Sequence, residues 1–161
     1  MKLSSPTVDN GGKGGLCCLH CTKGSSLTLK NGTIATSIRS ANSLIHIDGD
    51  LTLDGITITG TSSCPTILSI SDGTLTIQNQ SNISSDSNNV VLDVDKYSED
   101  AMIDVHVSDS KLSGKLDIID DIDENISIVV DETSDELILP INYKFCSDNN
   151  DRRLVNETED V

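Results

Sequence analysis

Residues that could bind a metal gather near the start of the chain, in the run Cys17-Cys18-Leu19-His20-Cys21. Thiolates and imidazoles are the usual zinc ligands, but a zinc site needs a second ligand pair at a workable distance. Alternation along an extended strand would send Cys18 and His20 to one face and Cys17 and Cys21 to the other. Reduced cysteine also serves as a small buried apolar side chain. We therefore predict no metal and no cofactor, and metal binding by this cluster stays open as the alternative.

Two histidines occur in similar surroundings, since His20 and His46 each stand between two apolar residues. If the two runs are stacked copies, the imidazoles lie one above the other, and the column continues with Ser69 and Asp93. Such a pair is a candidate for ligand contact, weak metal binding or pH sensing. Solvated side chains on a sheet surface are the simpler interpretation. A hydrolase would need an oriented nucleophile and base with an oxyanion donor, and we predict no catalytic residue.

The histidines belong to a repeat. Apolar pairs separated by one threonine start at positions 27, 51 and 75, a spacing of 24 residues each time: Leu27 and Leu29, Leu51 and Leu53, Leu75 and Ile77. Each pair has a second short alternating run before it and an isolated isoleucine after it, so three columns stay in phase. A coil of three short strands is typical of a parallel β-helix. We therefore predict an all-β fold, a right-handed parallel β-helix (β-solenoid) of about five to six coils.

Three segments carry a resemblance to known proteins: S-L-T-L-K-N-G-T-I, D-L-T-L-D-G-I-T-I and T-L-T-I-Q-N-Q-S-N-I, which begin at Ser26, Asp50 and Thr74. They resemble coils of the right-handed parallel β-helix superfamily with the pectate-lyase-like fold. That superfamily includes polysaccharide lyases, phage tailspikes, bacterial adhesins and polymorphic outer-membrane repeat proteins. The resemblance covers residues 16–139 and implies the fold. The Gly-Gly-Ala-aliphatic and Phe-x-x-Asn repeats of the outer-membrane group do not occur in this sequence.

The repeat also sets the expected domain boundaries. We expect a flexible leader or N-terminal edge at residues 1–15, the β-helix domain at 16–145, and a disordered acidic tail at 146–161. No amphipathic helix precedes the coils to cap them. An open strand edge favours pairing with another chain, end to end or edge to edge, unless the leader covers it.

The period is broken at residues 95–102, which we predict to form a loop that leaves the solenoid. The inward pair after Leu75 is then Val105 and Val107. Loops on a rigid scaffold commonly carry binding residues, and this loop contains Tyr97. Tyr97, His20 and His46 are therefore the candidate binding residues. An insertion without function is the alternative.

The charge of the chain excludes some partners. The formal net charge is −15, whereas binding to nucleic acid or to anionic lipid needs clustered Lys and Arg. No stretch approaches the ~18 apolar residues of a membrane-spanning helix. We therefore predict no nucleic-acid partner and no membrane insertion, and solubility is the simplest role for the charge. Five irregularly spaced cysteines do not form a disulfide framework of the small secreted type.

An acidic run near the end of the repeat region offers the oxygen ligands that calcium prefers: Asp117, Asp120, Asp121, Asp123 and Glu124. The order of these residues matches neither the EF-hand loop nor the glycine-rich nonapeptide repeat. We interpret the run as a solvated acidic turn.

These features predict a non-catalytic β-solenoid module of a surface or secreted protein, serving as an adhesin-like binding scaffold or as a spacer. Its ligand would be a protein or a glycan. Residues 1–15 lack the apolar core of a signal peptide, so a surface location requires that the chain be part of a larger exported protein. The alternative is a fragment of a pectate-lyase-like carbohydrate-active enzyme. The resemblance implies for such an enzyme paired carboxylates, or calcium with a basic residue, but Lys23, Lys30 and Arg39 are the only basic residues between 16 and 94.

Overall fold

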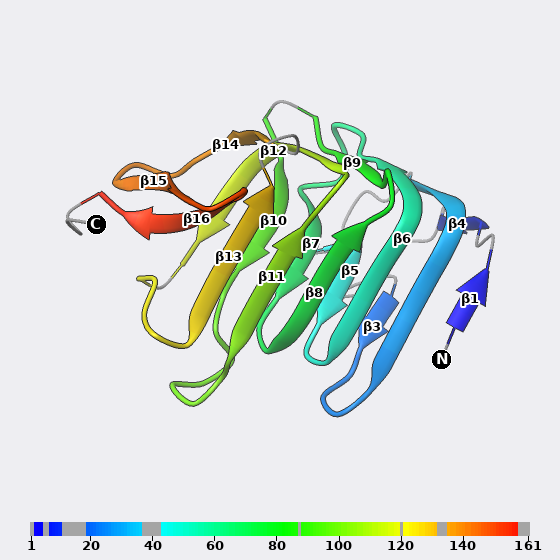
Figure 1. Cartoon of the computed structure of the whole chain (residues 1–161). Helices are drawn as coiled ribbons and strands as arrows, with labels where there is room; N and C mark the ends of the chain where they lie inside the picture. The colour runs from blue at the N-terminus through cyan, green and yellow to red at the C-terminus, as the bar shows by residue number, and fades with distance from the viewer. Residues whose placement is uncertain are drawn as a thin grey trace.

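The computed structural model describes residues 2–4, 7–10, 19–36, 43–86, 88–119, 121–131 and 135–157. Within these ranges the chain is a β-solenoid, in which short strands from successive coils pair in parallel (Figure 1). The predicted fold class is therefore confirmed. Among the described residues, no helix has the length and apolarity needed to cross a membrane.

Three columns of stacked strands form the walls. The first, here called the histidine column, contains β3 (Leu19–Cys21), β5 (Ile45–Ile47), β7 (Thr66–Ile70), β10 (Val90–Val94) and the end of β12 (Lys111–Ile118). The second, the ladder column, contains β1 (Lys2–Ser4), the first parts of β4 (Ser26–Thr36) and β6 (Asp50–Thr59), β8 (Gly73–Gln78), β11 (Ile103–Val107) and β13 (Ile126–Asp131). The third contains β2 (Thr7–Asn10), the later parts of β4 and β6, β9 (Asn82–Ser84), the start of β12 and β14 (Asp135–Ile138).

The ladder column carries the repeat that was read from the sequence. Each apolar residue pairs in register with its counterpart 24 positions on, and all six are buried: Leu27, Leu51 and Leu75 in one row, Leu29, Leu53 and Ile77 in the next. Val105 and Val107 take the following rung opposite Leu75 and Ile77, as predicted across the longer interval. Leu, Ile and Val make up most of the core, and they stack at the spacing of neighbouring strands.

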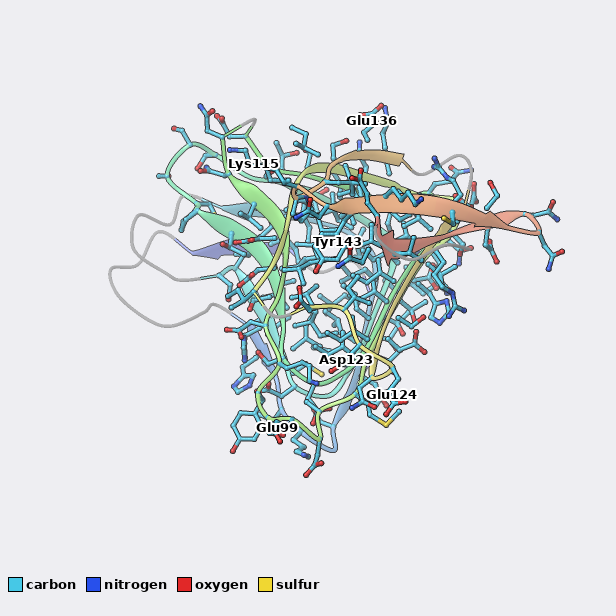
Figure 2. All side chains as sticks on the ribbon, turned by 90° about the vertical axis from the view of Figure 1, so that its left-hand side faces the viewer. Glu99, Lys115, Asp123, Glu124, Glu136 and Tyr143 are labelled. Carbon is cyan, nitrogen blue, oxygen red and sulfur yellow. The ribbon has the colours of Figure 1, made fainter. Side chains whose placement is uncertain are left out.

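The C-terminal region departs from the predicted coil count. The structure has about four turns instead of five to six, because the last strands leave the parallel stack. β15 (Tyr143–Asp148) and β16 (Asp151–Asn156) form an antiparallel hairpin, and β16 pairs antiparallel with β13. The hairpin crosses the end of the solenoid, and in the view onto that end Tyr143 lies over the interior (Figures 1 and 2). Through β16 it pairs with the edge of β13 at Val129–Asp131, an edge that would otherwise be exposed.

The hairpin also corrects the predicted tail. The prediction of a disordered tail from residue 146 is wrong for residues 146–157. These residues belong to the hairpin, and Leu154 and Val155 are buried against the stack. The chain reverses at Asn149, which has a φ of 58°, a conformation that asparagine adopts more readily than most residues. Residues 158–161 lie outside the described part of the chain.

The N-terminal region is an edge of the solenoid where the structure describes it. β1 pairs in parallel with the first part of β4, and β2 with its later part. Of the two expectations for residues 1–15, a flexible leader is wrong for residues 2–4 and 7–10, which form an N-terminal edge. Residues 1, 5, 6 and 11–18 lie outside the described residues.

Candidate functional site

The histidine column brings His20 and His46 together on the outer face of the solenoid. Register places His20 opposite His46, and the ring centroids are 5.1 Å apart with planes inclined at 60°. The column continues through Ser69 to Asp93 and then Asp117. The row of side chains expected from the repeat therefore exists in space.

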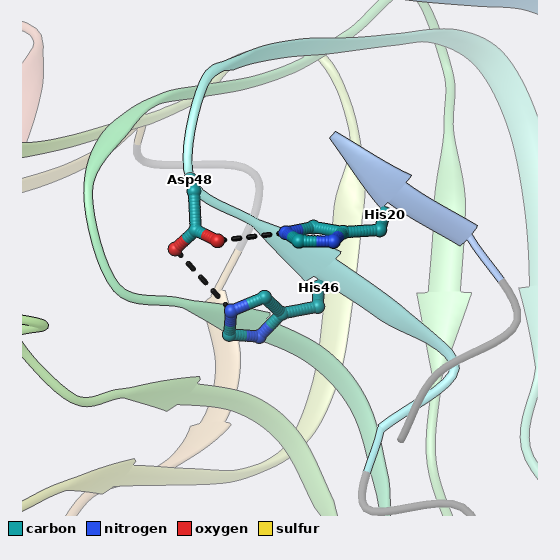
Figure 3. Close-up of side chains that lie close together, drawn as sticks. All are labelled: His20, His46 and Asp48. Atoms are coloured by element: carbon teal, nitrogen blue, oxygen red, sulfur yellow. Dashed lines mark hydrogen bonds and ion pairs between the residues drawn. The ribbon is translucent and has the colours of Figure 1, made fainter. Parts of the chain in front are cut away.

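A third side chain, that of Asp48, connects the two rings (Figure 3). Its Oδ2 lies 2.7 Å from Nε2 of His20, and its Oδ1 lies 3.3 Å from Nε2 of His46. Asp48 follows β5 directly, and its backbone N–H donates to the carbonyl of Cys21 at 2.8 Å. The side chains of His20, His46 and Asp48 are 44%, 30% and 22% exposed, so the group is held in place and still open to solutes.

Sequence reasoning missed Asp48, because an Asp-Gly dipeptide such as Asp48-Gly49 is typical of a turn and gives no reason to expect a binding residue. The alternation pattern gave no signal for it, because Asp48 follows the last residue of β5. The chain in fact turns at this point, which brings the carboxylate back over both rings.

Tyr97 lies at the same corner. A pocket of about 190 Å³ is lined by Lys23, Asp48, Asp72 and Tyr97, and we call it the corner pocket. Lys23 Nζ lies 3.1 Å from Asp72 Oδ2. Tyr97 is 75% exposed, and its backbone N–H donates to the carbonyl of Ser71 at 3.0 Å. Asp48 thus belongs both to the histidine pair and to the pocket beside Tyr97.

Asp72 holds the loop of residues 95–102 against the corner. Its Oδ1 accepts hydrogen bonds from the backbone N–H groups of Gly73, at 2.9 Å, and Met102, at 3.2 Å. Burial acts to raise the pKa of Asp72, but hydrogen bonds from Lys23 and Met102 outweigh it, so the pKa is lower than its ordinary value. Asp72 is therefore an anion at neutral pH, and it contacts both Lys23 and the backbone of Met102 at the end of the loop.

No known protein family, curated protein or solved structure matches this chain. The β-solenoid class rests on the strand register of the structure itself. The finer resemblance, to the pectate-lyase-like superfamily and its adhesins, stays a prediction.

The cysteines do not join the histidine pair where the structure describes them. Cys21 is buried, and its Sγ lies 3.5 Å from Ser25 Oγ and 3.4 Å from the carbonyl of Asp50, on the inner side of the strand that carries His20 outward. Cys64 is also buried. Cys17 and Cys18 lie outside the described residues, so the predicted Cys17/Cys18/His20/Cys21 cluster is described only in part.

The acidic run is divided among different surroundings. Asp117 lies in β12 beside Asp93, whereas Asp123 accepts a hydrogen bond from Lys96 Nζ at 2.6 Å. That hydrogen bond is the main reason why the pKa of Asp123 is lower than usual. Asp121 lies 3.4 Å from the hydroxyl of Tyr143. Asp120 lies outside the described residues.

Asp93 is the carboxyl of the histidine column whose pKa departs most from its ordinary value. Burial, with the nearby carboxylates of Asp117 and Asp95, raises its pKa from 3.8 to about 6. Its Oδ1 is buried and has no hydrogen-bond partner among the described residues. The folded protein therefore holds a destabilising negative charge at this position at neutral pH.

Replacing Asp93 with Asn should raise the free energy of unfolding at pH 7. The pKa of Asp93 is higher in the folded state, so the folded protein binds the proton more tightly and wild-type stability falls as pH rises from about 4 to 6. A shift of this size corresponds to at most ~3 kcal/mol, which solvent around this half-exposed group reduces to about 1 kcal/mol. Urea unfolding should show this gain at pH 7 and none at pH 3.5. The exposed Asp50 offers a control, and an equal gain in Asp50→Asn would contradict the interpretation.

Proposed function

We propose that this chain is a non-catalytic β-solenoid module of a surface or secreted protein, and that it binds a glycan at the corner pocket. The observation that carries the proposal is the meeting of Tyr97, Asp48 and the Lys23–Asp72 ion pair in one pocket on a rigid stack. A pocket of about 190 Å³ matches a single sugar ring better than a protein surface. The aromatic face would pack on the apolar face of the sugar, and the carboxylates would accept hydrogen bonds from its hydroxyl groups.

The charges of the protein narrow the class of glycan. The net charge of −15 and the two carboxylates in the pocket would repel uronic acids, sialic acids and sulfated sugars. A neutral or amino sugar fits this environment. The same repulsion argues against an acidic polysaccharide as the substrate of the alternative, a fragment of a carbohydrate-active enzyme with the pectate-lyase-like fold.

An adhesin-like role agrees with the way the pocket is built. Binding sites are commonly placed on loops that a rigid scaffold positions, and here hydrogen bonds from Met102 to Asp72 and from Tyr97 to Ser71 attach the loop to the coil beneath. A spacer would need no such attachment. The surface location that this role requires implies that the chain works as part of an exported protein.

Replacing Tyr97 with Ala should abolish most glycan binding. An array of neutral, amino and acidic oligosaccharides, probed with the purified full chain, should show binding to members of the first two classes. Loss of a central aromatic contact usually costs 1–2 kcal/mol or more, so the affinity of Tyr97→Ala should fall at least about tenfold. Ile141→Ala is the matched control, because Ile141 is also a highly exposed apolar residue (88%) and does not line the pocket.

Four results would count against the proposal. Equal binding by wild-type and Tyr97→Ala would place the site elsewhere, and no binding to any glycan would leave a protein ligand or a spacer role. Release of shortened oligosaccharides would support the enzyme alternative instead. An antibody to the chain that labels cells only after permeabilisation would contradict the surface location.

A further inference from the structure

Three metal-binding side chains converge on the outer face of the histidine column, away from the buried cysteines. The ligand atoms of His20, His46 and Asp48 all lie within 4.8 Å of one another, and among the described residues this is the one such group of three. In a tetrahedral zinc site with bonds of about 2.0–2.2 Å, ligand atoms are about 3.3 Å apart. The Asp48–His46 separation of 3.3 Å already has this value, and the Asp48–His20 separation of 2.7 Å needs to open by only about 0.6 Å.

We propose that His20, His46 and Asp48 bind one divalent transition-metal ion of the zinc type. The two Nε2 atoms and one carboxylate oxygen would be its protein ligands. This role goes beyond glycan binding and does not depend on it. In Figure 3 the carboxylate faces both rings from one side, the arrangement in which an ion placed between the three groups can contact all of them.

The ligand types select the metal. Imidazole nitrogen favours zinc, copper, nickel and cobalt, whereas calcium and magnesium require several oxygen ligands. One carboxylate and two imidazoles therefore exclude calcium and magnesium as the preferred ions. Three protein ligands leave a fourth position for water or for an external group.

The solenoid prepares the site before any metal arrives. His20 and His46 stand on paired parallel strands, so their spacing is fixed by backbone hydrogen bonds between β3 and β5. The hydrogen bond from the Asp48 N–H to the carbonyl of Cys21 connects the third ligand to the same two coils. A preformed arrangement reduces the ordering entropy that binding would otherwise cost.

Metal binding at this site requires no reactant other than the ion, because the only protons that move are those on the imidazole rings. In the metal-free protein Nε2 of His20 is hydrogen-bonded to Asp48, and Nε2 of His46 lies at ion-pair distance from the same carboxylate. A neutral ring frees Nε2 for the metal by carrying its proton on Nδ1, and a charged ring releases one proton to water. The ion then replaces the contacts of both rings with Asp48 and compensates the carboxylate charge.

Calorimetric titration of the untagged, chelator-treated full chain with zinc chloride tests the site. We expect one zinc ion per chain, with affinity at least about tenfold lower in His20→Gln and in His46→Gln, since each loses one of three ligands. Calcium chloride and magnesium chloride should give no comparable binding. His106→Gln is the matched control, because His106 also pairs with a carboxylate, Asp104 at 2.9 Å, but has no second imidazole. Far-ultraviolet circular dichroism should be the same for all variants.

A second probe separates this site from the cysteines. Cobalt(II) bound by nitrogen and oxygen shows visible bands without the near-ultraviolet charge-transfer band of a thiolate ligand. The Cys17→Ser/Cys18→Ser double variant should keep full zinc affinity, and so should Tyr97→Ala, which distinguishes this site from the glycan pocket. A thiolate band, loss of binding in the cysteine variant, or full affinity in both histidine variants would overturn the proposal.

Discussion

Replacing Leu53 with Asp should unfold the coils on both sides of it. Leu53 is fully buried in the ladder column and pairs in register with Leu29 and Ile77. Loss of a buried leucine side chain alone costs about 2–5 kcal/mol. The new carboxylate would be desolvated without a partner, which adds several kcal/mol. The sum approaches the whole free energy of unfolding of an ordinary domain, about 5–15 kcal/mol.

The matched control is the neighbouring residue on the same strand. Thr52 stands between Leu51 and Leu53 and points outward, so Thr52→Asp should change the free energy of unfolding by only about 0.5 kcal/mol. Urea unfolding followed by circular dichroism at pH 7 compares the two variants. Equal loss of stability in both would contradict the alternation on which the fold rests, and so would a fully folded Leu53→Asp protein.

The effect should spread along the stack. In a solenoid each coil packs mainly on its neighbours, so stability is close to a sum of coil terms and interface terms. Leu53 belongs to two interfaces, one with β4 and one with β8. Amide exchange in Leu53→Ala, a milder change, should therefore increase in β4, β6 and β8 before it increases in β13.

The ladder could be predicted from the sequence because its information is local and repeated. The strand segments that begin at Leu27, Leu51 and Leu75 have the same alternation and recur at the same interval. Their register follows once the strands stack in parallel. The rule extended to Val105 although the interval had lengthened, since the inserted residues leave the coil as a loop. The same logic placed His20 opposite His46.

The parts that were missed depend on contacts between distant segments. Asp48 reaches the two rings because the chain turns immediately after β5, and an alternation pattern contains no information on the direction of a turn. The tail was predicted to be disordered from its polar composition. Only Leu154 and Val155 are apolar between residues 147 and 157, and their burial depends on an open edge at β13.

The two proposals place different chemistry on the same corner. Asp48 faces the histidines through both of its oxygens and also lines the pocket with Tyr97. A metal held by Asp48 would replace part of the negative charge of the pocket with positive charge. If both proposals hold, zinc should extend glycan binding toward acidic sugars, because it removes repulsion at that wall.

Gly73→Ala should destabilise the corner by about 3 kcal/mol. Gly73 has a φ of 88°, a conformation that costs an L-residue about 1–2 kcal/mol. A Cβ at this position would also collide with the backbone carbonyl of Gly49 in the coil beneath, and overpacking of this kind costs about 1–3 kcal/mol more. The collision would push apart the two coils that contain Gly49 and Gly73, next to the hydrogen bond from the Gly73 N–H to Asp72. We therefore expect both a lower urea midpoint and weaker binding at the corner pocket.

Gly24 separates the two causes of this loss. Its φ of 75° is close to that of Gly73, but a Cβ there would meet no atom within 4 Å. Gly24→Ala should therefore show the backbone strain alone, about 1 kcal/mol, and the difference between the variants measures the contact between stacked corners. Similar losses in both variants would mean that the coils can move apart at no cost. In that case the close contact between Gly73 and Gly49 would not determine the positions of Asp72 and of the loop with Tyr97.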